Sequence, residues 1–329
     1  MATEIIFPAK NTFALGDYQD TPLEPDEIRG DTVATLISQG TELAWAGGDD
    51  FPIRPGYGAV FRVTHTGEAV KDIEAGELRF CMGHHRSTQQ YPARFTMPVP
   101  ASVDAETAVI ARLMGVSMTT LMTTSARPGD QVIISGAGPV GLCAAHNFRI
   151  GGYEVSVVEP DALRRDQMRA SGIESVFSAM PFDDAALAKK VRLVVDCSGH
   201  EAAVLDACNM VAQGGEVVLV GVPWRRHTDL SAHEIMHSVF FNFVQLRSGW
   251  EWELPIGSRG FVWEELLEGY NNASHSIFSG FERALRWLEE GRLDFAQLRR
   301  LVKPDDPASL YDAIGKRAIE EPLIVLDWT

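Results

Sequence analysis

The sequence has no long apolar run, since no stretch of eighteen or more apolar residues occurs in its 329 residues. Its first ten residues, MATEIIFPAK, lack the basic and apolar segments of a secretory signal peptide. Cysteine is scarce as well: the four cysteines, at positions 81, 143, 197 and 208, form no C-x-x-C pair and no regular framework. These absences predict a cytoplasmic protein with reduced thiols and no transmembrane helix.

Basic residues are outnumbered, with 29 Lys and Arg against 45 Asp and Glu, which gives a formal net charge of -16. Such a charge repels phosphate backbones and anionic lipid surfaces unless a local basic patch overcomes it. The clearest basic clusters, Arg164-Arg165 and Arg225-Arg226, are too small for that. We therefore expect no nucleic-acid or membrane partner, and a small molecule is the predicted ligand.

The residue pattern changes once along the chain and indicates two domains. Residues 1–115 are rich in turns and short apolar runs, such as 32–37 and 59–63, which predicts a β-rich domain. Residues 116–255 alternate strand and helix patterns, which is typical of a parallel sheet covered on both faces. The strands are expected at 131–135, 154–159, 175–178, 193–196, 216–220 and 241–246, with helices such as 142–150 and 202–211 between them.

The C-terminal part, residues 256–329, is expected to return to the first domain. An amphipathic helix over 281–290 is followed by Gly291 as a C-cap, and a final strand is expected over 323–326. The fold class is therefore α/β, with a β-rich domain and a doubly wound parallel sheet.

A glycine-rich turn joins the first strand of that sheet to its first helix. Val132 to Ser135 run directly into Gly136-Ala137-Gly138-Pro139-Val140-Gly141, and an apolar helix follows. The three glycines suit a tight turn, the approach of a pyrophosphate and close helix-strand packing, while the helix N-terminus favours the anion. A purely structural turn could use the same residues, but the position between strand and helix favours a dinucleotide site.

The expected second strand ends in Glu159, eighteen residues after Gly141. A carboxylate there accepts hydrogen bonds from the adenosine ribose hydroxyls and repels a 2′-phosphate, so NAD is predicted over NADP. Arg164 and Arg165 lie close enough in sequence to weaken that repulsion, and Arg164 is counted among the predicted cofactor-binding residues.

These motifs, taken with further segments, resemble the medium-chain dehydrogenase/reductase superfamily of alcohol, sorbitol and threonine dehydrogenases and their zinc-free relatives. The further segments are Val194-Val195-Asp196-Cys197-Ser198-Gly199, residues 214–221 (GGEVVLVG), residues 38–42 (SQGTE), 55–58 (PGYG), 98–100 (PVP) and 288–294 (LEEGRLD). The resemblance implies a GroES-like catalytic domain, a Rossmann domain and a homodimer. It also adds Ser198 and Gly221 to the cofactor-binding residues.

The resemblance further implies that the catalytic zinc is absent. In zinc-using members a Cys, a His from a G-H-E motif and a further Cys or acid bind the metal. Here Ser38 stands about where the first Cys would be, and Tyr57-Gly58 replace His-Glu. Serine and tyrosine are poor zinc ligands beside thiolate and imidazole. The four-cysteine lobe for a structural zinc is missing too, so no metal is expected.

Without zinc, hydrogen-bond donors and a general base must handle the substrate proton. The family places Thr41, Tyr57 and His84 near the nicotinamide, and these are the predicted catalytic residues. Each has an ordinary alternative: Thr41 as a local cap, Tyr57 as an aromatic filling space, and the pair His84-His85 as one surface and one packed imidazole.

Residues 233–237 (HEIMH) match H-E-x-x-H, the zinc-peptidase helix motif. The motif falls between the fifth and sixth expected strands, where a connecting helix is expected anyway. Only Glu264 or Glu265 could be imagined as a third ligand, so a coincidental match is favoured.

The predicted function is reversible oxidation of a secondary alcohol by NAD without zinc, with a polyol, sugar or cyclitol as the expected substrate. Three alternatives stay open: a zinc-free NADPH-dependent enone or quinone reductase, a zinc hydrolase acting through HEIMH, and a cofactor-binding regulator without turnover.

Overall fold

The computed structural model describes residues 2–253 and 275–329, which fold into two compact units. Unit 1 contains Met1–Arg112 and Glu282–Thr329, and unit 2 contains Leu113–Phe281. The domain boundaries predicted from the sequence follow residues 115 and 255. The first is close to the boundary between the two units, whereas the second unit extends further along the chain than predicted, to Phe281. Helix α9 (Ile277–Glu289) begins in unit 2 because the Phe281 ring packs against Gly115 so closely that a Cβ there would lie 2.2 Å from it.

Unit 2 is built on a six-stranded sheet with the order β10-β9-β8-β11-β12-β13. Every neighbouring pair in it is parallel. Numbered along the chain this order is 3-2-1-4-5-6, which is that of the doubly wound dinucleotide-binding fold and confirms the predicted fold class. The strands are β8 (Gln131–Ser135), β9 (Glu154–Val158), β10 (Val176–Phe177), β11 (Val191–Asp196), β12 (Val211–Leu219) and β13 (Gln245–Ser248).

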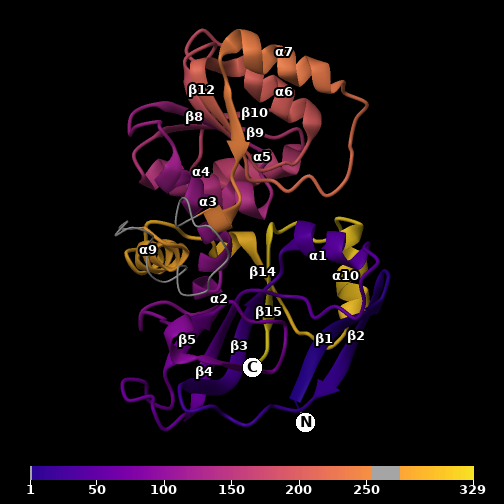
Figure 1. Cartoon of the computed structure of the whole chain (residues 1–329), viewed down its shortest axis with the longest axis vertical. Helices are drawn as coiled ribbons and strands as arrows, with labels where there is room; N and C mark the ends of the chain where they lie inside the picture. Colours follow the sequence, from indigo (N-terminus) through magenta and orange to yellow (C-terminus); the bar gives the residue numbers. More distant parts are fainter. Residues whose placement is uncertain (1, 254–274) are drawn as a thin grey trace. The chain divides into compact units, whose positions relative to one another are not determined.

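The central strands are buried on both faces: Val132, Ile133 and Ile134, which point alternately to opposite sides, are all fully buried. Helix α4 packs against β8 and β9, whereas α6 packs against β11 and β12 and lies beside α7 (Figure 1). The helices of this unit are α3 (Ala111–Thr123), α4 (Pro139–Ile150), α5 (Ala162–Ala170), α6 (Glu201–Met210) and α7 (Ala232–Asn242).

The predicted strand over 241–246 was largely wrong. Residues 241 and 242 complete α7, and Phe243 ends this helix in the left-handed conformation with φ 54°. The strand begins only at Gln245. The run Phe240-Phe241-Asn242-Phe243-Val244 carries no turn residue that would have marked the end of the helix, so composition alone favoured a strand.

Unit 1 contains a two-stranded hairpin and a seven-stranded sheet with the order β14-β15-β3-β4-β5-β7, in which β6 also pairs with β3. Strand β15 pairs antiparallel with β3, so the C-terminal strand lies in the same sheet as the N-terminal strands. The strands are β1 (Ala2–Ala9), β2 (Thr12–Tyr18), β3 (Glu27–Leu36), β4 (Ala59–Thr66), β5 (Leu78–Cys81), β6 (Thr88–Pro92), β7 (Met97–Pro98), β14 (Arg299–Val302) and β15 (Leu323–Asp327).

Helices α1 (Gln39–Ala46) and α10 (Pro307–Gly315) lie beside the β1–β2 hairpin (Figure 1). Between them a core of buried side chains includes Phe7, Ile37 and Tyr311. The short helix α2 (Ala105–Ala108) begins at Asp104, whose carboxylate accepts from the Thr107 N–H. This arrangement fixes α1, the helix that carries Thr41.

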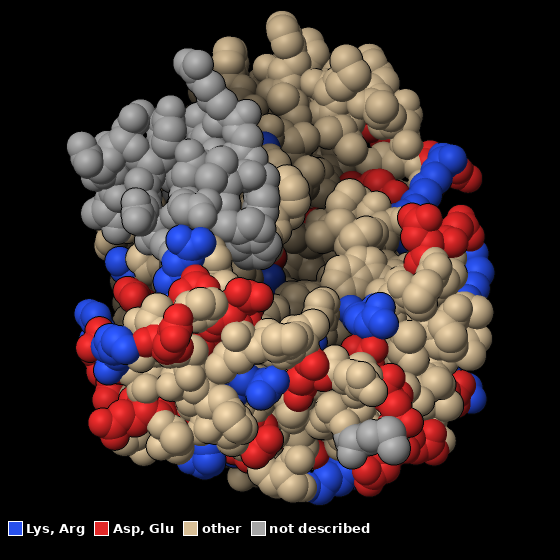
Figure 2. Space-filling view, turned by 60° about the horizontal axis from the view of Figure 1, so that its bottom comes forward, with Lys and Arg blue, Asp and Glu red and all other residues tan. Residues whose placement is uncertain are grey.

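The surface is mixed in charge on the face that Figure 2 shows, where Lys and Arg side chains are scattered among Asp and Glu side chains. No helix within residues 2–253 and 275–329 is long and apolar enough to cross a membrane.

Candidate functional site

The glycine loop follows β8 in unit 2, at the point where the sheet order reverses between β8 and β11. Gly136 has φ +95°, a conformation that side chains rarely adopt. A Cβ on Gly141 would lie 1.8 Å from the carbonyl oxygen of Gly136, so this glycine lets α4 approach the turn. Two of the three glycines are therefore required by the loop itself.

Gly138 differs from the other two because the protein does not fill the space beside it. The residue is the N-cap of α4, with Pro139 as the first helical residue. A Cβ there would meet only one side-chain atom, Nη1 of Arg164, at 4.0 Å. Helices leave their first N–H groups, here those of Val140 and Gly141, without partners inside the helix, so open space and free donors coincide. A pyrophosphate fits such a cradle.

Glu159 lies immediately beyond β9 and is 6% exposed. One carboxylate oxygen accepts from the Ala137 N–H at 2.7 Å, and the other accepts from the Asp161 N–H at 2.9 Å. An ionised carboxylate has about four acceptor positions. Glu159 can therefore hold the glycine loop and still accept the two ribose hydroxyls.

Two arginine side chains near Glu159, those of Arg164 and Arg165, have different partners. Arg165 donates to the main-chain oxygens of Glu159 and Pro160. Arg164 forms no side-chain hydrogen bond or ion pair with any residue that the structure describes, and it faces the glycine loop. Of the two, Arg164 is the one available to an anionic ligand.

The loop after β11 packs on the other side of Gly136. Asp196, which is fully buried, accepts hydrogen bonds from the hydroxyl of Ser198 at 2.6 Å and the N–H of Gly199 at 3.0 Å. Burial raises the pKa of Asp196. A Cβ on Gly221 would lie 2.5 Å from the N of Gly199. Ser198 and Gly221 thus shape this loop, and their contact with a cofactor remains a prediction.

The three predicted catalytic residues lie on adjacent segments of unit 1. Thr41 is on α1, not in a turn, and its hydroxyl makes no hydrogen bond with the described residues. Trp45 of the same helix contacts the Tyr57 ring, with ring centroids 5.9 Å apart. The guanidinium of Arg112 lies 4.4 Å from the centroid of Tyr57, on a side that Gly58 leaves open. Arg112 was not predicted from the sequence.

His84 is half-buried, and its Nδ1 lies 3.0 Å from the carbonyl oxygen of Gly56. Because a carbonyl only accepts, Nδ1 carries the proton and Nε2 of the neutral ring is the acceptor. Burial lowers the pKa of His84, and the positive charge of Arg86 lowers it further. The neutral imidazole, which can take up a proton, is thereby favoured.

His85 belongs to a buried network instead. Its Nε2 lies 3.2 Å from both carboxylate oxygens of Glu42, and its Nδ1 lies 2.8 Å from Oγ1 of Thr35. Glu42 also accepts from the hydroxyl of Tyr311 and from the Ser38 N–H. In the sequence Glu42 stood out only as part of the SQGTE segment, and His85 only as the partner of His84. Nothing in the sequence linked them to Tyr311, which lies on α10.

A family model described as zinc-binding dehydrogenase matches residues 139–246, which includes α4 and the sheet beyond it. L-galactonate-5-dehydrogenase of Escherichia coli (strain K12) is 31% identical over 36% of this chain and 37% of its own length. A putative D-xylulose reductase of Rhizobium meliloti (strain 1021) is 29% identical over 70% of this chain and 59% of its own. These matches span less than two thirds of the relatives' length.

Solved structures extend the likeness to the whole chain. Galactitol-1-phosphate dehydrogenase from Escherichia coli matches with a TM-score of 0.80 at 15% identity, covering 99% of both chains. The chain therefore shares the fold of these dehydrogenases over its whole length, and residues 139–246 match the family model. The GroES-like and Rossmann domains implied by the resemblance are thereby confirmed.

The zinc site of the zinc-using medium-chain dehydrogenases, which the sequence resembles, does not fit the residues present. Ser38 is 7% exposed, and its N–H donates to Glu42. The nearby acid and imidazole, Glu42 and His85, already bond to each other deep in the core. No group of three His, Cys, Asp or Glu side chains within the described ranges could hold a metal ion. The zinc-free branch stays a prediction.

The HEIMH motif forms the first half of α7. Glu234, the residue that would activate water, closes a capping box with Ser231 at the helix N-terminus. The rings of His233 and His237 are 6.1 Å apart, and His237 packs on Phe241 at 4.5 Å. The suggested partners Glu264 and Glu265 lie outside the described residues. In the described structure Glu234 of this motif caps the N-terminus of α7.

Proposed function

We propose that this chain is an NAD(H)-dependent oxidoreductase that transfers hydride between the nicotinamide ring and a secondary alcohol or ketone, without a catalytic zinc ion. One observation carries the proposal: the open space at Gly138, beside a buried Glu159 that still has acceptor positions. The substrate class we propose is a polyol, sugar or cyclitol. The names of the similar proteins, L-galactonate-5-dehydrogenase and putative D-xylulose reductase, support that class.

NAD, when bound, supplies the hydride acceptor for alcohol oxidation, and the residues of this chain must hold it and manage the proton. The N–H groups at the start of α4 bind the pyrophosphate. Glu159 accepts the ribose hydroxyls, and its negative charge disfavours the 2′-phosphate of NADP. Arg164 is positioned to contact the phosphates from the open side of Gly138.

The proton of the alcohol is assigned to His84. Its Nε2 is the free acceptor because Nδ1 is bound to Gly56, and burial favours the neutral ring. Thr41 offers a hydroxyl without another partner among the described residues, and Tyr57 is held against Arg112. In this proposal the two hydroxyls orient the substrate oxygen, and His84 takes its proton.

We also propose a homodimer formed through unit 2. β13 ends the described six-stranded sheet, and an edge strand can pair with a second chain. Phe240, Phe241 and Phe243, just before this strand, are 73%, 63% and 64% exposed. Light scattering should give twice the 36.1 kDa of one chain. A monomeric mass at working concentrations would count against the dimer.

The test of function combines three measurements on the purified protein. We expect tighter binding of NADH than NADPH in a fluorescence titration, no stoichiometric zinc by metal analysis, and NADH formation with at least one of xylitol, sorbitol or myo-inositol. A strong NADPH preference would favour the enone or quinone reductase. Zinc that is lost on His237→Ala would favour the hydrolase. Tight NADH binding without turnover on any alcohol would favour a regulator.

A further inference from the structure

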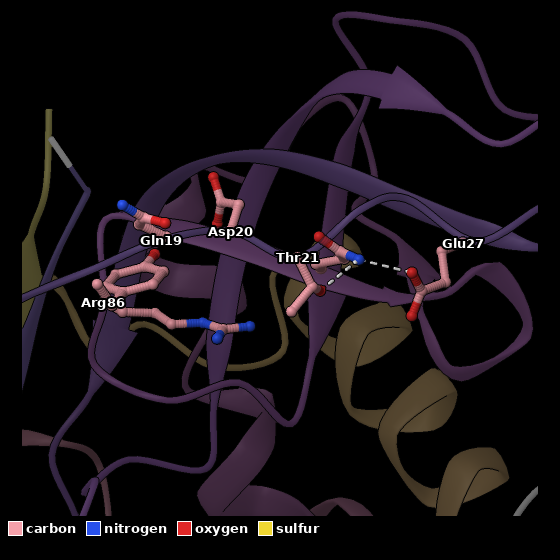
Figure 3. A pocket seen from close by; sticks show the side chains of 7 residues that line it. Gln19, Asp20, Thr21, Glu27 and Arg86 are labelled. Carbon is pink, nitrogen blue, oxygen red and sulfur yellow. Dashed lines mark hydrogen bonds between the residues drawn. The ribbon is translucent and has the colours of Figure 1, made fainter.

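A small polar pocket opens in unit 1, between the end of β2 and the segment that follows β5 (Figure 3). It encloses about 120 Å³ and is lined by Tyr18, Asp20, Thr21, Glu27, Arg86 and Gln90, among others. A drug-sized site occupies about 300 Å³ or more, and one water takes up about 30 Å³ of liquid. The pocket therefore suits a molecule of only a few heavy atoms.

Arg86 brings a positive charge to the pocket and forms no direct ion pair with the described residues. Its guanidinium lies over the ring of Tyr18, 5.6 Å from the centroid. No acceptor or acid among the described residues bonds to this side chain, and its Nε is buried without a partner. An arginine has five N–H donors and cannot lose its charge, so an anionic group from outside the chain would satisfy it.

Two acids lie on the same pocket without a basic partner among the described residues. Asp20 accepts from the Thr88 hydroxyl through one oxygen, at 2.6 Å. Glu27 accepts from Nε2 of Gln90, at 2.6 Å, through one oxygen (Figure 3). The second oxygen of each carboxylate accepts no hydrogen bond from the described residues. The Oε1 atom of Gln90 is buried without a partner, so acceptors cluster opposite the arginine.

We propose that this pocket binds a small zwitterion, an α-amino acid with a short side chain, whose carboxylate meets Arg86 and whose ammonium faces Asp20 and Glu27. A neutral polyol would leave all three charges without counter-charges. A hydroxy acid would match Arg86 but place its negative charge beside two acids without an ammonium to offset them. The proposal does not depend on the oxidoreductase function.

Isothermal titration without nicotinamide cofactor tests it, with glycine and L-serine as probes and glycerate and xylitol as matched ligands that lack the ammonium. We expect binding of an amino acid and at least about tenfold weaker binding of glycerate and xylitol. Arg86→Leu should weaken the amino acid by about tenfold or more, and Glu27→Gln should weaken it as well. Arg62→Leu is the control, because Arg62 bonds to the Gly76 carbonyl instead.

Arg86→Gln serves as the second variant if Arg86→Leu does not fold, as judged by thermal unfolding. The proposal is overturned if neither amino acid binds at up to about 20 mM, if glycerate or xylitol binds equally well, or if both Arg86 variants retain the affinity. Each of these results can be obtained whether or not the protein oxidises alcohols.

Discussion

The carboxylate of Glu42 accepts a hydrogen bond from Nε2 of His85, and neither side chain has exposed surface. The pair connects α1, which carries Thr41, to the loop that carries His84. Tyr311 adds α10 to the same carboxylate. The segments that hold the proposed catalytic groups are thus held together by a buried polar network, whose members must all remain satisfied.

Glu42→Ala should lower the free energy of unfolding by about 3–5 kcal/mol, because it leaves His85 and the Tyr311 hydroxyl buried without their acceptor. Urea denaturation measures the loss. Glu68→Ala is the matched control, since Glu68 is exposed and its carboxylate bonds to none of the described residues. Equal stability of the two variants would show that the network contributes little.

Gly138→Ala and Gly141→Ala should separate cofactor binding from folding. The methyl group of Gly138→Ala enters open space, so we expect the unfolding temperature of the wild type. We expect this variant to bind NADH at least about tenfold more weakly than the wild type does. The second methyl would overlap the Gly136 carbonyl, so we expect a clear loss of stability. NADH titration by fluorescence and thermal unfolding distinguish the two. Unchanged affinity in a folded Gly138→Ala protein would argue against a pyrophosphate at this position.

Glu159→Ala should shift the cofactor preference toward NADP. Hydrogen bonds to a charged group contribute about 1.5–3 kcal/mol, so losing them should cost NAD about tenfold or more in kcat/KM. NADP also loses a repulsive partner, and the ratio of kcat/KM for NADP over NAD should rise. Glu154→Ala, an exposed change at the other end of β9, is the control. A ratio equal to that of the control would remove Glu159 from the specificity site.

Much of the fold was predictable because its signals are local. Strands such as β8 read as continuous apolar runs, since both of their faces are buried, and two glycines of the following turn, Gly136 and Gly141, are required by the backbone of the turn itself. The end of α7 was not predictable in this way. Phe240 and Phe241 are apolar yet exposed, so composition indicated a buried strand where the chain forms a surface helix.

The candidate site was predictable only in part, for the same physical reason. Glu159 follows its strand at a recognisable spacing, so it could be named. The network of Glu42, His85 and Tyr311 joins three distant parts of the sequence, and only pairing of β15 with β3 brings the C-terminal part into the sheet of unit 1. The contact of Arg112 with the Tyr57 ring was likewise not predictable, because it depends on the Arg112 side chain occupying the space where a Cβ of Gly58 would lie.

Alcohol oxidation should depend on pH through His84. Burial and Arg86 lower its pKa, so the basic form persists below the ordinary value of about 6.5, and kcat/KM should fall only at lower pH. His84→Asn should abolish this fall of kcat/KM at low pH, the acid limb of the profile, and should reduce the rate about a hundredfold or more. Arg86→Leu should move the limb to higher pH. His65→Asn, an exposed change, should alter nothing, and an intact acid limb in His84→Asn would assign the proton elsewhere.

Stability in mild acid should depend on His146, on α4. Burial, with help from the charge of Arg149, lowers the pKa of this histidine to about 4. The unfolded chain then binds its proton near pH 6.5, whereas the native protein stays neutral. The unfolding free energy should therefore fall as the pH drops from about 6.5 to about 4, and this group should add no further loss below that.

The shift corresponds to a contribution on the order of 3 kcal/mol, measurable from urea denaturation curves at a series of pH values. His146→Gln removes the titrating group and should flatten this part of the profile relative to the wild type. His65→Gln is the control, because the exposed His65 should leave the slope unchanged. If the unfolding free energy of His146→Gln falls with pH as steeply as that of the wild type, other groups control acid stability. The contribution described here comes from the imidazole of residue 146 and must be absent from the variant.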